Sequence, residues 1–210
     1  MKNYNTIILE KDLEISFKGD RDYIYASDMF ILIAKELIAK DFTNIKNIDF
    51  SVHSISNKEI KLLLFQSDVL ETNEDNLAQI KFESNDTTYF GVIRKGSSEI
   101  LKRTEYNEKE VFSNAEIDKV KQRIELSNDY KKYSNLDVLT AMNKRLLYEV
   151  RPDIEGKWLS VRLQLDDLED LLKERSNYAV ELIKVFSNKY SKSILLSNNK
   201  KIGNLFFSLI

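Results

Sequence analysis

The sequence has no cysteine, a single proline, a single histidine and only five glycines in 210 residues. Without cysteine the chain cannot form disulfides, use a thiol nucleophile or bind zinc or iron–sulfur clusters through thiolates. One histidine excludes a histidine-rich metal site and leaves at most one imidazole general base. Five glycines leave no glycine-rich loop for holding a phosphate group. Any catalytic site would therefore consist mainly of carboxylates and backbone amides.

Charges of the two signs are nearly balanced, with 34 acidic and 32 basic side chains, a net charge of −2 and a pI of about 5.7. Since there is no strong basic excess, charge gives no reason to expect a nucleic acid partner. Every apolar run falls short of the ~20 residues that span a bilayer, and the first residues lack the apolar core of a signal peptide. We expect a cytoplasmic protein with no membrane span, no metal and no cofactor.

In the first half, one apolar helix is expected between strands. Met29–Phe42 is apolar at helical spacing, and Ser27 or Asp28 is expected to cap its N-terminus. Asn85-Asp86 is typical of a hairpin turn, because both residues tolerate positive φ. Alternating or dense apolar residues predict strands at 13–18, 48–54, 59–66, 77–84 and 87–95.

The second half begins after a charged connector at 102–110. The segment 116–126 is either helical or, at its end (123–126), a strand. Beyond it, the pattern predicts a helix at 136–150, a strand at 158–165, a long helix at 166–188 and a terminal hairpin at 190–196 and 202–209.

A shift of 109 residues aligns Ile15–Val52 with Ile124–Val161 without a gap. Identical residues then coincide, such as Asp28 with Asp137, and apolar residues of the two central helices coincide at several further positions. Such self-similarity indicates a duplicated unit and favours a strand at 123–126. We expect two repeats, 1–110 and a more divergent 111–210.

The order of elements, with one strand before a central helix and a run of antiparallel strands after it, resembles the hot-dog fold. The resemblance implies an α+β chain in which a curved antiparallel sheet wraps each central helix, as a double hot-dog. Hot-dog proteins act on acyl thioesters of coenzyme A or acyl carrier protein, so either is an expected partner. Two hot-dog units normally pair, and this chain would be a monomeric pseudo-dimer or form a homodimer.

The resemblance also implies a site just before, or in the first turns of, the central helix, where helix N–H groups favour negative charge. Asp22 and Asp28 are the candidate catalytic carboxylates there. Arg21 and Arg94 are candidates for contacting a phosphate of a pantetheine or nucleotide group, with an exposed arginine as the competing role. Tyr23 and Tyr25 are further candidate substrate-binding residues.

His53 is the only imidazole and the remaining catalytic candidate, because a dehydratase needs a histidine paired with a carboxylate. The residue 109 positions later is Arg162, so such a site would be present once. Structural roles compete with each of these assignments: a helix cap for Asp28, a polar turn for Asp22, and a surface or hydrogen-bonded histidine for His53.

Two functions therefore stay open. One is an acyl-thioester hydrolase or dehydratase, or an acyl binder. The alternative is a non-catalytic interaction or scaffolding subunit, for example of a bacterial assembly, because the sequence has so few catalytic residue types.

Overall fold

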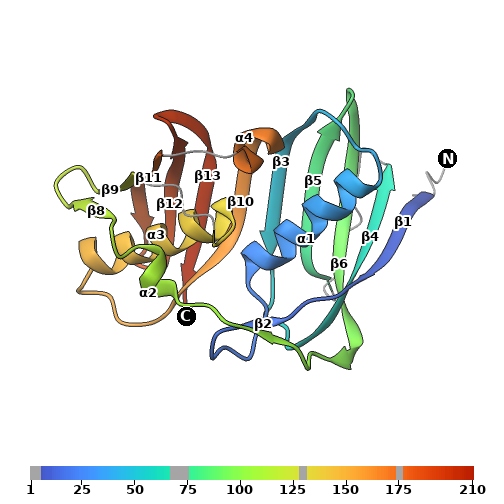
Figure 1. Cartoon of the computed structure of the whole chain (residues 1–210), viewed down its shortest axis with the longest axis horizontal. Coiled ribbons are helices and arrows are strands. Elements are labelled where there is room, and N and C mark those ends of the chain that lie inside the picture. Colours follow the sequence, from blue (N-terminus) through green and yellow to red (C-terminus); the bar gives the residue numbers. More distant parts are fainter. Residues whose placement is uncertain (1–5, 67–75, 128–131, 174–176) are drawn as a thin grey trace. The chain divides into compact units, whose positions relative to one another are not determined.

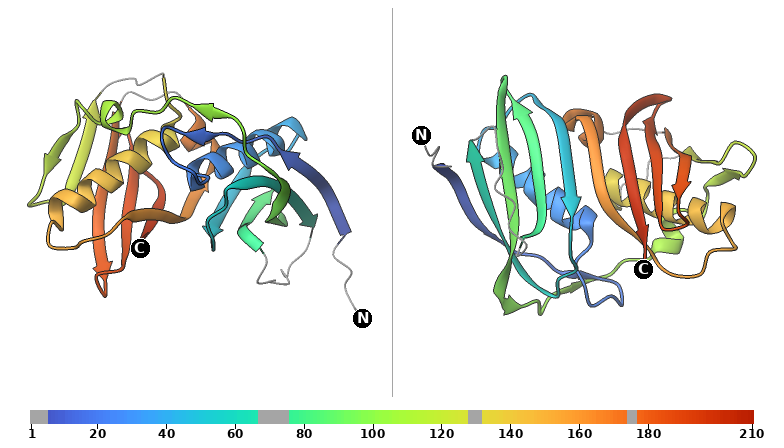
Figure 2. Two further views of the ribbon diagram at one scale, coloured as in Figure 1. Left: turned by 90° about the horizontal axis from the view of Figure 1, so that it is seen from below. Right: turned by 180° about the vertical axis from the view of Figure 1, so that it is seen from behind.

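The computed structural model describes residues 6–66, 76–127, 132–173 and 177–210. The chain is an α+β protein that divides into two compact units, Met1–Tyr106 and Asn107–Ile210 (Figure 1). In each unit a central helix packs on one face of an antiparallel sheet (Figure 2).

Unit 1 holds the first central helix. Its five main strands are antiparallel, in the order β1-β4-β6-β5-β3, and two short strands, β2 and β7, pair in parallel. The elements are β1 (Thr6–Leu13), β2 (Phe17–Lys18), α1 (Ala26–Ala39), β3 (Ile45–Val52), β4 (Lys58–Gln66), β5 (Asn76–Ser84), β6 (Thr87–Glu99) and β7 (Arg103–Thr104).

The core of unit 1 lies between α1 and the sheet. Phe30, Ile33 and Leu37 recur at helical spacing and are at most 1% exposed. The ring of Phe30 lies 5.6 Å from that of Phe50 on β3. Packing on the sheet removes this apolar stripe from water, and that burial stabilises the contact between helix and sheet.

Unit 2 repeats the plan around a second central helix. Its elements are α2 (Glu108–Val111), β8 (Glu116–Asp118), β9 (Arg123–Ser127), α3 (Asn135–Val150), β10 (Trp158–Asp167), α4 (Leu168–Leu172), β11 (Asn177–Phe186), β12 (Tyr190–Ser197) and β13 (Lys200–Leu209). The strands lie in the order β10-β13-β12-β11-β9-β8, and every pairing between neighbours is antiparallel.

The two sheets differ in strand order. In unit 2 the tight turns at 187–189 and 198–199 make β11, β12 and β13 consecutive neighbours. In unit 1 the longer segment 67–75 separates β4 from β5, and β6 lies between them. Short connections force a hairpin, whereas longer ones allow another strand to intervene. Descent of both units from one duplicated segment stays a prediction.

The long helix expected at 166–188 is wrong. Among the described residues of this segment only Leu168–Leu172 is helical, and Asn177–Phe186 is β11. Tyr178, Val180 and Leu182 alternate toward the core, a period-2 pattern that the charged residues around 170 obscured. Four strands therefore follow α3 in the described part of unit 2, one more than expected.

Other boundaries also move. The first strand is Thr6–Leu13 rather than 13–18. The helix expected at 29–42 begins at Ala26 and ends at Ala39, and Phe42 instead packs against Phe82 and Tyr89. The segment 123–126 is a strand, and Asn85-Asp86 form the hairpin turn with φ values of 48° and 62°.

Several buried polar groups of unit 2 lack a hydrogen-bond partner among the described residues. Asn143 on α3 is fully buried, and neither atom of its amide group is paired. By contrast, the amide of Asn135 on the same helix bonds to the carbonyls of Leu171 and Lys173 and to the hydroxyl of Tyr178. An unpaired buried amide costs free energy, so Asn143 is a weak point of the core.

We expect Asn143→Ala to leave the free energy of unfolding unchanged or to raise it by up to ~1 kcal/mol, because it removes an unpaired amide. Asn135→Ala is the matched control and should lower it by ~1–3 kcal/mol, since Tyr178 and two carbonyls lose a partner. Urea unfolding followed by circular dichroism measures both. A larger loss for Asn143→Ala than for Asn135→Ala would show that the Asn143 amide is paired.

Close packing of β13 against β10 requires Gly203. A Cβ atom there would meet the carbonyl oxygen of Gln164 at 2.1 Å and Leu165 Cδ2 at 2.9 Å. We expect Gly203→Ala to lower the free energy of unfolding by at least ~1–3 kcal/mol, as overpacking does. Ser208→Ala on the same strand should change it by less than ~0.5 kcal/mol. Equal effects of the two substitutions in urea unfolding would refute this packing argument.

Candidate functional site

The segment that leads into α1 is held by the two short strands of unit 1. Phe17 lies opposite Arg103 and Lys18 opposite Thr104. Gly19 follows with a φ of 57°, and its N–H donates to the carbonyl of Thr104 at 2.9 Å. A Cβ at this position would lie 3.0 Å from the carbonyl oxygen of Tyr106, so conformation and space both favour glycine.

Arg103 fixes the backbone of this segment. Its guanidinium donates to the carbonyl of Gly19 and, at 2.8 Å, to that of Arg21, and it lies 5.3 Å from the centre of the Phe17 ring. Farther along, the N–H of Ile24 donates to the carbonyl of Ser56 at 2.9 Å. These bonds anchor the residues before α1 at both ends.

Three tyrosines and a guanidinium gather on this anchored segment. The ring centres of Tyr23 and Tyr25 are 5.9 Å apart in a stacked arrangement, and Tyr106 meets Tyr25 edge-on at 5.9 Å. The guanidinium of Arg21 lies 4.2 Å from the centre of the Tyr25 ring, within cation–π range. The hydroxyl of Tyr25 is buried and has no hydrogen-bond partner among the described residues.

A lysine and a carboxylate complete the group. Lys18 Nζ lies 2.5 Å from a carboxylate oxygen of Asp28 and 5.2 Å from the centre of the Tyr106 ring. Both charged side chains are largely buried, at 15% and 17% exposed. We call these residues the α1 entry cluster: Lys18, Arg21, Tyr23, Tyr25, Asp28 and Tyr106.

Asp28 does not cap the helix, and neither does Ser27. The N-cap residue is Tyr25, whose side chain makes no capping bond, and Asp28 lies in the first turn. A carboxylate in the first turn is stabilised by the partial positive charge of the helix end. Because Asp28 is also paired with Lys18, it is not an unengaged base in this structure.

The other two expected catalytic groups stand apart. Asp22 is exposed in the loop before α1. His53 is exposed directly after β3, and its backbone N–H donates to the carbonyl of Leu77 at 2.8 Å. Within the described residues, no hydrogen bond or ion pair joins the imidazole to Asp22 or Asp28.

Lys18 and Tyr106 are members of the cluster that sequence reasoning missed. Lys18 was a residue of an expected strand, and Tyr106 lay in the charged connector between the halves. No local pattern links them, because they meet only through the pairing of β2 with β7. The glycine at position 19, which adopts a positive φ, is a local sequence feature that indicates an unusual backbone conformation there.

The corresponding end of α3 in unit 2 has a different character. Ser134 is a true N-cap: its hydroxyl accepts from the N–H of Asp137 at 3.1 Å and donates to the Asp137 carboxylate at 2.7 Å. Asn135 is bonded to Tyr178 and to the backbone at the C-terminal end of α4. This helix end is closed by internal polar contacts, so the entry cluster belongs to unit 1 alone among the described residues.

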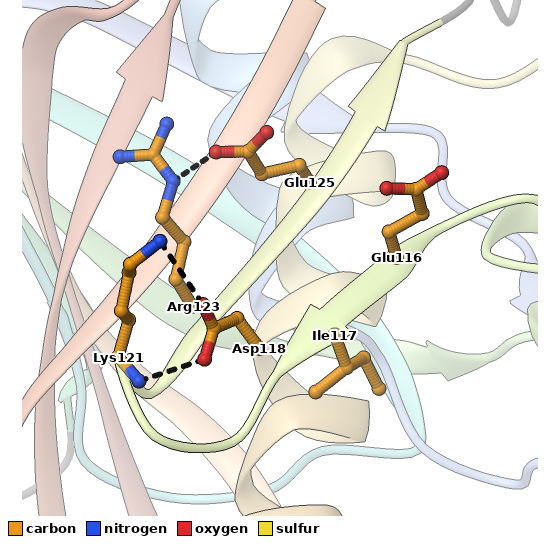
Figure 3. A pocket seen from close by; sticks show the side chains of 6 residues that line it. All are labelled: Glu116, Ile117, Asp118, Lys121, Arg123 and Glu125. Atoms are coloured by element: carbon orange, nitrogen blue, oxygen red, sulfur yellow. Dashed lines mark hydrogen bonds and ion pairs between the residues drawn. The ribbon is translucent and has the colours of Figure 1, made fainter.

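A pocket in unit 2 lies at the β8–β9 hairpin and is lined by charged side chains (Figure 3). Asp118 accepts from the backbone N–H and side chain of Lys121, and both interactions lower the pKa of its carboxyl group. Burial alone would lower the pKa of Arg123, but hydrogen bonds to Glu181 and Glu125 outweigh it and raise that pKa. These charges neutralise one another, so the pocket offers no unpaired catalytic group beyond the exposed Glu116.

Among the described residues, no group of histidine and acidic side chains could hold a metal ion. None of their helices is long and apolar enough to cross a bilayer.

Sequence comparison gives no relatives: no protein-family model matches the chain, and no curated protein matches it either. Solved structures do match. The dehydratase domain of PpsC from Mycobacterium tuberculosis, solved in complex with C12:1-CoA, has a TM-score of 0.50 at 7% identity, covering 96% of this chain and 92% of that chain. A monomeric dehydratase domain from a trans AT polyketide synthase split module has a TM-score of 0.46 at 9% identity, covering 97% and 100%. At such identities the likeness concerns the fold alone: the chain has a double hot-dog fold.

Proposed function

We propose that this chain binds an acyl thioester of coenzyme A or acyl carrier protein, and that the α1 entry cluster contacts the phosphate-bearing arm of that ligand. The observation that carries the proposal is the anchored group at the N-terminal end of α1, made of Arg21, the Lys18–Asp28 ion pair and three tyrosines. The shared fold with a domain whose structure contains C12:1-CoA supports it.

The cluster has the chemistry that such a ligand requires. The guanidinium of Arg21 can form charge-assisted hydrogen bonds to phosphate oxygens. Lys18 is paired with Asp28 and neutralises that carboxylate beside the guanidinium. Tyrosine rings provide flat surface for an adenine ring or for the pantetheine chain. The N-terminus of α1, a helix of 14 residues, adds partial positive charge at the same place.

The arrangement favours binding over hydrolysis or dehydration. A general base must lie within hydrogen-bonding reach of the proton it takes and is usually oriented by a second group. Asp28 is engaged by Lys18. His53 has no oriented partner among the described residues, and Asp22 is exposed. The candidates therefore form no assembled acid–base pair.

We expect Arg21→Ala to weaken binding of dodecanoyl-CoA by about 10- to 100-fold, the loss typical of a charge-assisted contact. Isothermal titration calorimetry measures the dissociation constant. Arg94→Ala is the matched control, because Arg94 lies on β6, where its side chain bonds to Asn76. Equal affinity of wild type and Arg21→Ala, or no binding by wild type, would remove the proposal.

The same samples test for catalysis. Release of free coenzyme A or loss of water from a 3-hydroxyacyl thioester by wild type, abolished in His53→Ala or Asp22→Asn, would contradict a role limited to binding. No turnover by wild type, with binding retained, agrees with the proposal.

Tyr25 separates a ligand contact from a structural role. Because its hydroxyl is buried without a partner, Tyr25→Phe should leave the free energy of unfolding unchanged or raise it slightly. Because that hydroxyl is closed to solvent, the ligand contacts the ring, and affinity for dodecanoyl-CoA should stay within about twofold of wild type in calorimetry. Loss of stability in Tyr25→Phe would show that the hydroxyl is paired, and loss of affinity at unchanged stability would show that the ligand reaches it.

A further inference from the structure

The end of the β11–β12 hairpin in unit 2 carries unpaired positive charge. Lys184 lies directly opposite Lys192 in the register of the two strands, and Lys189 is in the turn between them. Like charges at directly opposed positions destabilise a sheet. None of the three lysines forms an ion pair with a described residue.

The same hairpin end exposes large apolar side chains. Ile183 is 51% exposed, Phe186 42% and Tyr190 55%, and Phe186 lies opposite Tyr190 in the register. We call residues 183–192 the lysine hairpin; the segment contains no Asp or Glu. Lysine and aromatic side chains thus share one surface at the end of the two strands.

Carboxylates do not neutralise this end from outside. Arg151 reaches the turn, where it donates to the side-chain oxygen of Asn188 at 3.0 Å. The same guanidinium lies 2.9 Å from the carboxylate of Asp153, which is therefore already paired. The net effect of the neighbouring loop is to leave the hairpin positive.

The lysines point away from the core. On β12, Ser191 and Ser193 are buried, and Lys192 lies between them, so its side chain is on the opposite face of the strand. Across the next strand Lys192 is opposite Phe206, and its ammonium lies 5.7 Å from the centre of that ring. The positive charge of Lys192 therefore lies on the outer face of the sheet.

We propose that the lysine hairpin docks the protein onto an anionic phospholipid membrane. Each lysine near such a surface strengthens binding about fivefold, and tyrosine and phenylalanine suit the layer between headgroups and acyl chains. Lysine is a flexible point charge that matches a fluid layer of phosphates, without the fixed geometry that arginine imposes.

The surface suits the other anionic macromolecules less well. Stable protein interfaces are depleted in lysine and enriched in arginine. Single-stranded nucleic acid needs open ring faces for base stacking, but Lys184 lies 4.8 Å from the centre of the Phe186 ring, and Lys192 and Arg162 both lie within 6 Å of the Phe206 ring. An acidic protein and a nucleic acid are therefore outcomes of the test.

The test is co-sedimentation of the full chain with vesicles of phosphatidylserine and phosphatidylcholine, compared with vesicles of phosphatidylcholine alone. We expect binding only to the anionic vesicles, weakened by salt. The variant Lys184→Gln/Lys189→Gln/Lys192→Gln should bind about a hundredfold less tightly. Phe186→Ser/Tyr190→Ser should also weaken binding, but salt should still weaken it further.

A matched control changes the net charge equally. Lys35→Gln/Lys40→Gln/Lys46→Gln removes three exposed lysines of unit 1 and should leave vesicle binding unchanged. Equal losses in both triple variants, or equal binding to neutral vesicles, would overturn the proposal. Binding to polyglutamate or oligothymidine without binding to anionic vesicles would overturn it in favour of an acidic protein or a nucleic acid.

Discussion

Burial of one apolar helix face per unit is the constraint on which the structure depends. A helix as apolar as α1 cannot remain in water, and one curved sheet is the surface that covers Phe30, Ile33 and Leu37. The strands are therefore long, antiparallel and apolar on the side that faces the helix. The opposite side of each sheet does not face the helix and can therefore carry other side chains. In unit 2 that side carries lysines and aromatic rings.

The candidate site depends on a much smaller set of backbone contacts. Two residue pairs between β2 and β7, together with the bonds from Arg103 to the carbonyls of Gly19 and Arg21, hold the segment that leads into α1. That anchoring brings Tyr106, at the far end of unit 1, against Tyr25. The tyrosines are thereby ordered in the absence of a ligand, which would reduce the entropic cost of the binding proposed above.

Sequence reasoning recovered the features that depend on local periodicity. Both central helices, the Asn85-Asp86 hairpin and the strand at 123–126 are confirmed, because burial of one face leaves a readable pattern. The helix expected at 166–188 failed because the acidic start of the segment is helical while Asn177–Phe186 is not. Pairing with β9 and β12 makes Asn177–Phe186 a strand, and such long-range contacts leave no local pattern in the sequence.

The arrangement of the candidate site was predictable only in its local part, and its function stays a proposal. Arg21, Tyr23, Tyr25 and Asp28 are close in sequence, and the helix start that unites them is a local feature. The partners Lys18 and Tyr106 and the isolation of His53 follow from tertiary placement. The N-cap assignment failed for a related reason: the residues after Gly19 are positioned by Arg103 rather than by a capping side chain.

The difference in strand order between the units has a consequence for how the chain folds. In unit 2 the strands β11, β12 and β13 pair in sequence through tight turns, so their contacts close short loops. In unit 1 the strand β6 must enter between β4 and β5, which requires pairing across a larger part of the chain. Because local contacts lose less chain entropy as they form, the C-terminal three strands are expected to nucleate early, although unit 1 leaves the ribosome first.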